Sequence, residues 1–137
     1  MRDPDRFFMS IANAAAAESY ATKRKVGAVA VKGESILDFS YNGTLPGEDD
    51  ACEVEDPSGR LITKPTVLHA EEHLLLKLAR NGGGAAGATI YCNWSPCLGC
   101  ARLMAGARVA RVVYGAVHDT DGAEFLISRG VPCTLLE

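Results

Sequence analysis

ATIYCNWSPCLGC, residues 88–100, pairs a short strand with the start of a helix. Residues 88–93 are mostly apolar, and the run is short enough to be a buried strand. Ser95 and Pro96 then predict an N-cap and a first helical position, so a helix follows almost at once. A strand that leads directly into a helix is the unit from which α/β folds are built.

The segments on either side continue the alternation of strands and helices. Residues 42–66 carry no period and predict a long loop, which in compact domains is usually functional or mobile. Strands joined by helical crossovers pair in parallel. The sequence therefore predicts an α/β protein, a three-layer α/β/α sandwich with a mixed five-stranded sheet in a single domain over residues 1–137. Before the segment 88–100, the sequence predicts a helix over 5–20 with Phe7 and Phe8 on its apolar side, and strands over 26–31 and 35–41 joined by a turn. A helix over 66–80 follows, with Leu68, Leu75, Leu76 and Ala79 on one face. The last predicted elements are a strand over 109–114, a helix over 121–129 with an Asp121–Glu124 capping box, and a strand over 131–136.

Charge and hydropathy exclude several classes of partner. The net charge is −3, and the only basic cluster is Lys23-Arg24-Lys25. A long nucleic acid needs many Lys and Arg contacts to its phosphates, so we expect no such partner, whereas one small phosphate-bearing substrate is compatible with this cluster. No apolar run is long enough to span a bilayer, and residues 1–6 lack the features of a secretory signal. We therefore expect no membrane association and a cytoplasmic location.

The cysteines indicate metal binding rather than disulfides. There are five, an odd number, in a chain without an export signal. Cys97 and Cys100 are spaced to place both sulfurs on one face of a helix, and His69 and Glu71 lie near the start of another. Helix N-termini favour thiolates and lie near the carboxyl ends of parallel strands. One imidazole and two thiolates can hold zinc with the fourth position open to water, as in catalytic zinc sites.

Glu71 lies two residues from the imidazole and is predicted to be a general acid–base rather than a ligand. Zinc acidifies a water, and a carboxylate beside it can carry the proton to a substrate. Each part has a simpler interpretation when taken alone: a histidine or glutamate at a helix start often caps it, and C-x-x-C occurs in redox pairs and structural zinc knuckles. The joint spacing favours a catalytic zinc site. Cys92 and Cys133 are interpreted as small core residues, and Cys52 has no identifiable partner.

The pattern His-x-Glu followed by Pro-Cys-x-x-Cys is typical of zinc-dependent nucleobase deaminases. Over nearly its whole length the chain resembles the cytidine and deoxycytidylate deaminase superfamily, most of all the dCMP deaminases of the type carried by bacteriophages. This resemblance implies the cytidine deaminase-like fold and zinc-dependent hydrolysis of dCMP to dUMP and ammonia, with Glu71 as the proton shuttle, in a bacterium or a phage-infected cell. The segments that carry it are Lys23–Val29, Tyr41–Thr44, Lys64–Glu71, Gly87–Tyr91 and Ser95–Cys97.

The resemblance also implies contacts to a nucleotide. By this resemblance, Asn42 is expected to contact the deoxyribose hydroxyl. Ser95 and the backbone of Ala70 would hold the edge of the base, as they do in relatives, although Ser95 is equally well explained as a helix cap. Lys23 is the candidate for the phosphate, or else part of a solvated basic turn.

Several departures from the family pattern leave details of the site open. His73 stands where the family usually has asparagine, and is expected to support the site or an interface rather than to bind metal. Leu45 intervenes in the loop before the proline. His118 replaces a common tyrosine and would stack on a base or lie on an exposed loop. Trp94 either forms a wall of the pocket or packs in the core, and the core is favoured because tryptophan side chains are usually well buried.

Many dCMP deaminases are hexamers activated by dCTP and inhibited by dTTP, so the resemblance implies a homo-oligomer, a hexamer, with nucleotide effectors. The acidic stretch Glu48-Asp49-Asp50 would hold Mg²⁺ for such a nucleotide, or is a solvated loop. Two other functions stay open. One is deamination of a different substrate, namely 5-substituted dCMP, cytidine or adenosine in tRNA. The other is a non-enzymatic, zinc-stabilised interaction module.

Overall fold

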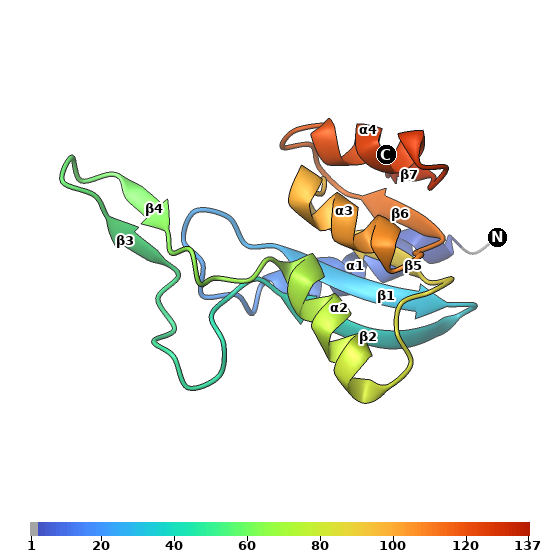
Figure 1. Ribbon diagram of the computed structural model, residues 1–137, viewed down its shortest axis with the longest axis horizontal. Helices are drawn as coiled ribbons and strands as arrows, with labels where there is room; N and C mark the ends of the chain where they lie inside the picture. The colour runs from blue at the N-terminus through green and yellow to red at the C-terminus, as the bar shows by residue number, and fades with distance from the viewer. Residues whose placement is uncertain (1–2) are drawn as a thin grey trace.

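The computed structural model describes residues 3–137 and consists of a five-stranded sheet with helices on both faces and a separate two-stranded hairpin (Figure 1). The sheet has the strand order β2-β1-β5-β6-β7. The elements in chain order are α1 (Pro4–Ala16), β1 (Gly27–Lys32), β2 (Ser35–Tyr41), β3 (Glu53–Glu55), β4 (Leu61–Thr63), α2 (Ala70–Asn81), β5 (Thr89–Cys92), α3 (Leu98–Gly106), β6 (Arg111–Tyr114), α4 (Asp121–Ser128) and β7 (Cys133–Leu135).

The central sheet is mixed. β1 pairs antiparallel with both β2 and β5, whereas β5, β6 and β7 pair in parallel. α3 connects β5 to β6 and α4 connects β6 to β7, so the neighbours joined by helices are the parallel ones. The predicted three-layer α/β/α sandwich with a mixed five-stranded sheet is confirmed.

Both faces of β1 are buried, which explains its unbroken apolar sequence. Ala28 and Ala30 belong to the largest core cluster, with residues of α2, α3 and α4, whereas Val29 and Val31 belong to a second cluster, with residues of α1. Successive side chains of a strand point to opposite faces, so α1 covers one face of the sheet and the other three helices cover the other. Figure 1 shows the same division.

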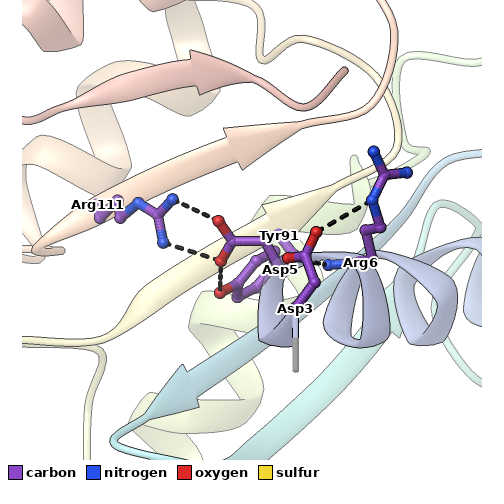
Figure 2. A network of polar contacts seen from close by, with 5 residues as sticks. All are labelled: Asp3, Asp5, Arg6, Tyr91 and Arg111. Carbon is purple, nitrogen blue, oxygen red and sulfur yellow. Dashed lines mark hydrogen bonds and ion pairs between the residues drawn. The ribbon is translucent and has the colours of Figure 1, made fainter. Parts of the chain in front are cut away.

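α1 is fixed to the sheet by a carboxylate that bridges two strands (Figure 2). Asp5 accepts hydrogen bonds from the Tyr91 hydroxyl of β5 at 2.7 Å and from Arg111 Nη1 and Nη2 of β6 at 3.0 and 2.7 Å. The hydrogen bonds from Arg111 hold the Asp5 pKa below its usual value, although burial acts in the opposite direction. At the same end of α1, Asp3 is the N-cap and accepts from the Arg6 backbone N–H at 3.3 Å.

Replacing Asp5 with asparagine is expected to lower the free energy of unfolding near neutral pH by about 1–2 kcal/mol, because a bidentate but partly exposed ion pair is lost. The Asp5 pKa is lower in the folded chain, so its contribution is fully present above the ordinary value of 3.8 and is lost as the pH falls through the folded-state value. Urea denaturation at neutral and acid pH measures this. The matched control is Asp3→Asn, which removes a carboxylate from the same helix start but keeps a good capping side chain. Equal losses in the two variants would contradict the bridge.

α2 starts later than the sequence predicts. The expected helix over 66–80 begins at Ala70, because the preceding residues are held in an extended pairing in which Gly43 and Leu68 exchange backbone hydrogen bonds of 3.1 and 2.9 Å. The predicted apolar face is wrong for Leu76, which is 52 % exposed, and for Ala79, which is also exposed. The helix packs instead through Ala70, Leu74 and Leu78, which are four residues apart. A buried face assigned from the leucines alone is therefore misplaced, because one of the packing positions is an alanine. The buried residues are Ala70, Glu71, Leu74 and Leu78.

Other predicted boundaries also need correction. Residues 42–66 are not a structureless loop, because they contain the β3–β4 hairpin, which projects away from the rest of the molecule (Figure 1).

The predicted ends of two helices also differ from the structure. α1 ends at Ala16 rather than at residue 20, since the backbone N–H groups of residues 17–19 bond to carbonyls of the last helical turn. Phe7 is 58 % exposed and so lies outside the apolar face. The N-cap of α4 is Thr120, with no side-chain cap hydrogen bond, so the predicted capping box is not formed.

Among the helices of residues 3–137, none combines the length and the apolar character needed to cross a membrane. Met1 and Arg2, which begin the stretch interpreted as lacking a secretory signal, lie outside the described residues.

Candidate active site

Three metal-ligand side chains meet between the starts of α2 and α3. His69 Nδ1 lies 3.5 Å from Cys97 Sγ and 3.3 Å from Cys100 Sγ, and the three donor atoms lie within 4.8 Å of one another. Atoms bonded to one zinc ion at about 2.0–2.3 Å in tetrahedral geometry stand about 3.3–3.8 Å apart. These donors therefore fit a zinc ion with one position left for another ligand. Within the described part of the chain, no other group of His, Cys, Asp or Glu has this arrangement.

Each ligand lies at the start of a helix. His69 is the N-cap of α2, and its backbone N–H donates to the Glu72 carboxylate at 2.7 Å, which orders the turn that carries the imidazole. Cys97 is the N-cap of α3, and its sulfur accepts from the Cys100 N–H at 3.4 Å. The helix start predicted at Ser95 is therefore wrong, because the sulfur of Cys97, two residues further on, accepts from a free N–H of the first turn.

Hydrogen bonding within the three ligands shifts their protonation strongly. The hydrogen bonds with Cys100 and His69 lower the pKa of Cys97 to about 3, against the effect of burial. The hydrogen bond with Cys97 raises the pKa of His69 to about 9, and the same partner together with burial raises the pKa of Cys100. Protons on the imidazole and on Cys100 compete with a metal ion for the same atoms. Zinc binding is thus expected to release protons and to weaken as the pH falls.

Glu71 is a buried carboxyl group beside the metal ligands. It is 4 % exposed and lines the same cavity as His69 and Cys97. Burial raises the pKa of Glu71 to about 7, with its own backbone N–H and His69 acting in the opposite direction. A divalent cation at the three ligands would favour the carboxylate form. A carboxyl group in this position can accept a proton and return it, as general acid–base chemistry requires.

A cavity of about 300 Å³ joins the metal ligands to the predicted substrate residues. It lies at the carboxyl ends of β2, β5 and β6, the edge at which ligands bind in open α/β sheets. Sequence reasoning missed Glu53 and Thr63, which line the cavity from the β3–β4 hairpin, because the hairpin itself was not predicted. The structure does bring together all of the predicted substrate residues: Lys23, Asn42, Ala70, Trp94, Ser95 and His118.

Ser95 anchors the loop that follows β6. Its hydroxyl donates to the Asp119 carbonyl at 2.7 Å and accepts from the His118 backbone N–H at 2.8 Å. Ser95 itself is buried, whereas His118 is exposed at the cavity. The serine therefore shapes one wall of the cavity by holding this loop.

Asn42 and His73 hold the chain on the other side. The Asn42 side-chain oxygen accepts from the Val26 N–H at 3.0 Å, and its Nδ2 donates to the Arg24 carbonyl at 2.9 Å. His73 Nε2 lies 3.1 Å from the Gly43 carbonyl oxygen. Asn42 thus supports the entry to β1 besides lining the cavity, and His73 contacts the neighbouring loop rather than the metal ligands.

Three remaining predictions concern residues near the site. Trp94 lines the cavity and is half-buried, so its interpretation as ordinary core is wrong. Cys52 is buried beside Ala21 and Val67 and lines the same cavity as His69 and Cys97, but it does not belong to the group of possible metal ligands. Residues 48–50 are exposed and do not line the cavity.

Gly122 allows α4 to approach the segment that carries Cys97. A Cβ at this position would lie 2.1 Å from the Pro96 carbonyl oxygen and 2.7 Å from that of Cys97. Gly122→Ala is therefore expected to displace this segment, to weaken zinc binding and to lower the free energy of unfolding by about 1–3 kcal/mol. The matched control is Gly106→Ala in α3, where a Cβ would meet nothing within 4 Å. Competition with a chromophoric chelator measures the affinity, and unchanged zinc binding by Gly122→Ala would refute this role.

The fold and the site define a class of protein: an α/β/α sandwich with a three-ligand metal site and a buried glutamate in one cavity. The family model of the cytidine and deoxycytidylate deaminase zinc-binding region matches residues 2–116, and the chain belongs to this family. The family model describes a zinc-binding region, so zinc is the metal that the His-Cys-Cys group could hold.

Individual relatives are similar over most of the chain. The deoxycytidylate deaminase of Mycobacterium phage D29 is 36 % identical over 123 residues, which cover 82 % of this chain and 94 % of that protein. The Schizosaccharomyces pombe deoxycytidylate deaminase is 33 % identical over 136 residues, which cover 93 % of this chain but 42 % of the yeast protein. The chain thus spans less than half the length of the yeast relative. The solved structure of the dCMP deaminase from cyanophage S-TIM5 in complex with dCMP and dUMP matches with a TM-score of 0.90 and 34 % identity, covering 99 % of this chain and 100 % of that one.

Proposed function

We propose that this protein is a zinc-dependent deaminase that hydrolyses dCMP to dUMP and ammonia and so contributes to deoxyribonucleotide supply. The observation that carries the proposal is that Glu71 lines the same cavity as His69 and Cys97, which form one possible metal-ligand group with the buried Cys100. The names of the phage D29 and cyanophage relatives support the choice of dCMP, since the latter protein was solved with dCMP and dUMP.

The reaction adds water to the aminated ring carbon and releases the amino group as ammonia. Zinc held by the three ligands would supply Lewis-acid activation of a water nucleophile at neutral pH. Glu71 accepts the proton that the water loses and delivers it to the neighbouring ring nitrogen. The carboxylate then takes a second proton, from the hydroxyl group now attached to the ring carbon, and gives it to the departing amine, so that Glu71 is ionised again after each turnover. Burial of Glu71 keeps bulk water from competing for these protons.

The cavity walls would orient the nucleotide. In the proposed complex the backbone of Ala70 and the hydroxyl of Ser95 face the polar edge of the base, and Asn42 contacts the sugar. His118 and Trp94 offer ring surfaces for stacking. All five line the cavity, which supports these assignments.

A substrate panel tests the proposal. The zinc-loaded protein is incubated separately with dCMP, 5-methyl-dCMP, deoxycytidine, cytidine, CMP and a tRNA anticodon stem-loop, and ammonia release is measured. We expect dCMP to have the highest kcat/KM. Turnover of another member without turnover of dCMP would overturn the substrate, and no turnover of any member by the folded, zinc-loaded protein would favour a zinc-stabilised interaction module.

The resemblance further implies a homo-oligomer, a hexamer, with dCTP and dTTP as effectors and Mg²⁺ held at residues 48–50. Exposed apolar side chains on the edge strand β2, namely Ile36, Leu37 and Phe39, support self-association. Light scattering coupled to gel filtration gives the number of subunits. Activity measured with dCTP or dTTP, with and without Mg²⁺, tests the effectors.

A further inference from the structure

We propose that Arg24, held over the Trp94 ring, is the residue that binds the 5′-phosphate and so makes the site select a nucleoside monophosphate over the corresponding nucleoside. The inference rests on the proposed deaminase function. It assigns the phosphate to Arg24 rather than to Lys23, which was the sequence-based candidate.

Arg24 is placed at the cavity by a contact with an aromatic ring. Its guanidinium carbon lies 4.9 Å from the centroid of the Trp94 ring, over the ring, and both side chains line the cavity that contains the metal ligands. Such a contact uses one face of the ring and leaves the N–H donors of the guanidinium for another partner. Within residues 3–137, no carboxylate forms an ion pair with Arg24, and no acceptor is hydrogen-bonded to its guanidinium.

The backbone on both sides of Arg24 is fixed. Asn42 Nδ2 donates to the Arg24 carbonyl at 2.9 Å. On the preceding side, the Glu53 carboxylate accepts from the backbone N–H groups of Thr22 and Lys23 at 2.9 and 3.1 Å. Because Glu53 belongs to the β3–β4 hairpin, the hairpin holds the basic loop against the cavity. A guanidinium on a fixed backbone loses less freedom on binding a ligand than one on a mobile loop.

The neighbouring lysines are less well placed. Lys23 is exposed, whereas Arg24 is half-buried. Lys25 is also exposed and borders a different hollow, between the end of α1 and Tyr41. Arginine also presents a planar fork of donors that matches two oxygens of a phosphate, which a lysine ammonium does not.

A deoxyribonucleotide bound with its base at Glu71 would direct its phosphate away from the metal ligands. A fork of N–H donors held at the wall of the same cavity can take two of the phosphate oxygens. A nucleoside has no group that uses this fork, so it binds without the charge-assisted hydrogen bonds. The selectivity for the monophosphate would therefore come from Arg24.

The first test compares kcat/KM for dCMP and for deoxycytidine in the full-length, zinc-loaded protein. Arg24→Gln is expected to lower the ratio of the two values by about 10- to 100-fold, mainly through KM for dCMP, because charge-assisted hydrogen bonds are lost. Arg24→Lys is expected to recover only part of the ratio. Lys25→Gln, which removes the same charge one residue away and outside the cavity, is the matched control and is expected to leave the ratio unchanged. An equal fall for both substrates in Arg24→Gln, or an equal fall of the ratio in Lys25→Gln, would overturn the proposal.

The second test needs no turnover. Trp94 is the only tryptophan of the chain, so its fluorescence reports on the proposed site. We expect dUMP to change this emission at concentrations about 10- to 100-fold lower than deoxyuridine does, and Arg24→Gln to remove the difference. Equal affinity of the unmodified protein for the two compounds would refute the proposal even if the protein deaminates dCMP. A protein that distinguishes the two compounds but deaminates neither dCMP nor deoxycytidine would refute the proposed function and leave the phosphate site standing.

Discussion

Glu71→Gln is expected to lower kcat for dCMP by about 10²- to 10⁴-fold while zinc content and fold are retained, because the amide fills the same volume but cannot carry a proton. The carboxyl group is buried in the cavity beside the metal ligands but is not one of them. Loss of proton transfer is thus separable from loss of metal. Steady-state ammonia release and metal analysis of the same preparation measure the two quantities together.

The matched control is Glu72→Gln. Glu72 is the next residue in α2, and its carboxylate accepts a hydrogen bond from the His69 N–H, which a glutamine oxygen can also accept. We expect this variant to retain most of the activity. A Glu71→Gln protein with unchanged turnover, or one whose activity is lost only together with its zinc, would contradict the role of proton carrier.

Cys100→Ser is expected to abolish stoichiometric zinc binding and, with it, turnover. Cys100 is 2 % exposed and contributes one of the two sulfurs that lie near the imidazole. A serine hydroxyl at this position is a far weaker zinc ligand than a thiolate. Since bound metal adds its binding free energy to folding, we also expect this variant to lose the rise in Tm that zinc produces in the unmodified protein. Metal analysis after dialysis and thermal unfolding with and without zinc provide the readouts.

Cys133→Ser serves as the matched control, because Cys133 is similarly buried but lies in β7 among core residues. It is expected to cost about 1–3 kcal/mol of stability through the buried hydroxyl but to keep its zinc. If the two variants lose zinc to the same extent, the loss follows from a weakened fold, and the ligand role of Cys100 is wrong.

The metal site could be predicted from sequence because its chemistry is local. His69 and Glu71 lie within three consecutive residues, and Cys97 and Cys100 lie within four, so each pair carries its own geometry onto one helix start. The pairing of strands across helices brings the two starts to one edge of the sheet. Both steps depend on short-range rules, and the structure follows them.

The helix caps could not be predicted in the same way. A free N–H at a helix start donates to whichever acceptor reaches it, and at α3 this acceptor is the Cys97 sulfur. Ser95, the better capping residue by type, instead bonds to the loop that carries His118. The competition between these partners is decided by contacts between distant segments, which no local pattern contains.

By itself, the sequence determined the three layers and the mixed sheet, and it predicted that His69, Cys97 and Cys100 form one group of possible metal ligands, since periodicity and ligand spacing act over a few residues. Only the tertiary structure decided what surrounds them. The hairpin residue Glu53 holds the basic loop, and Arg24 lies over Trp94 from a segment far away in the chain. These contacts form because folding closes long loops and so brings distant segments together. Packing in the folded chain, rather than proximity in the sequence, determines which residues meet.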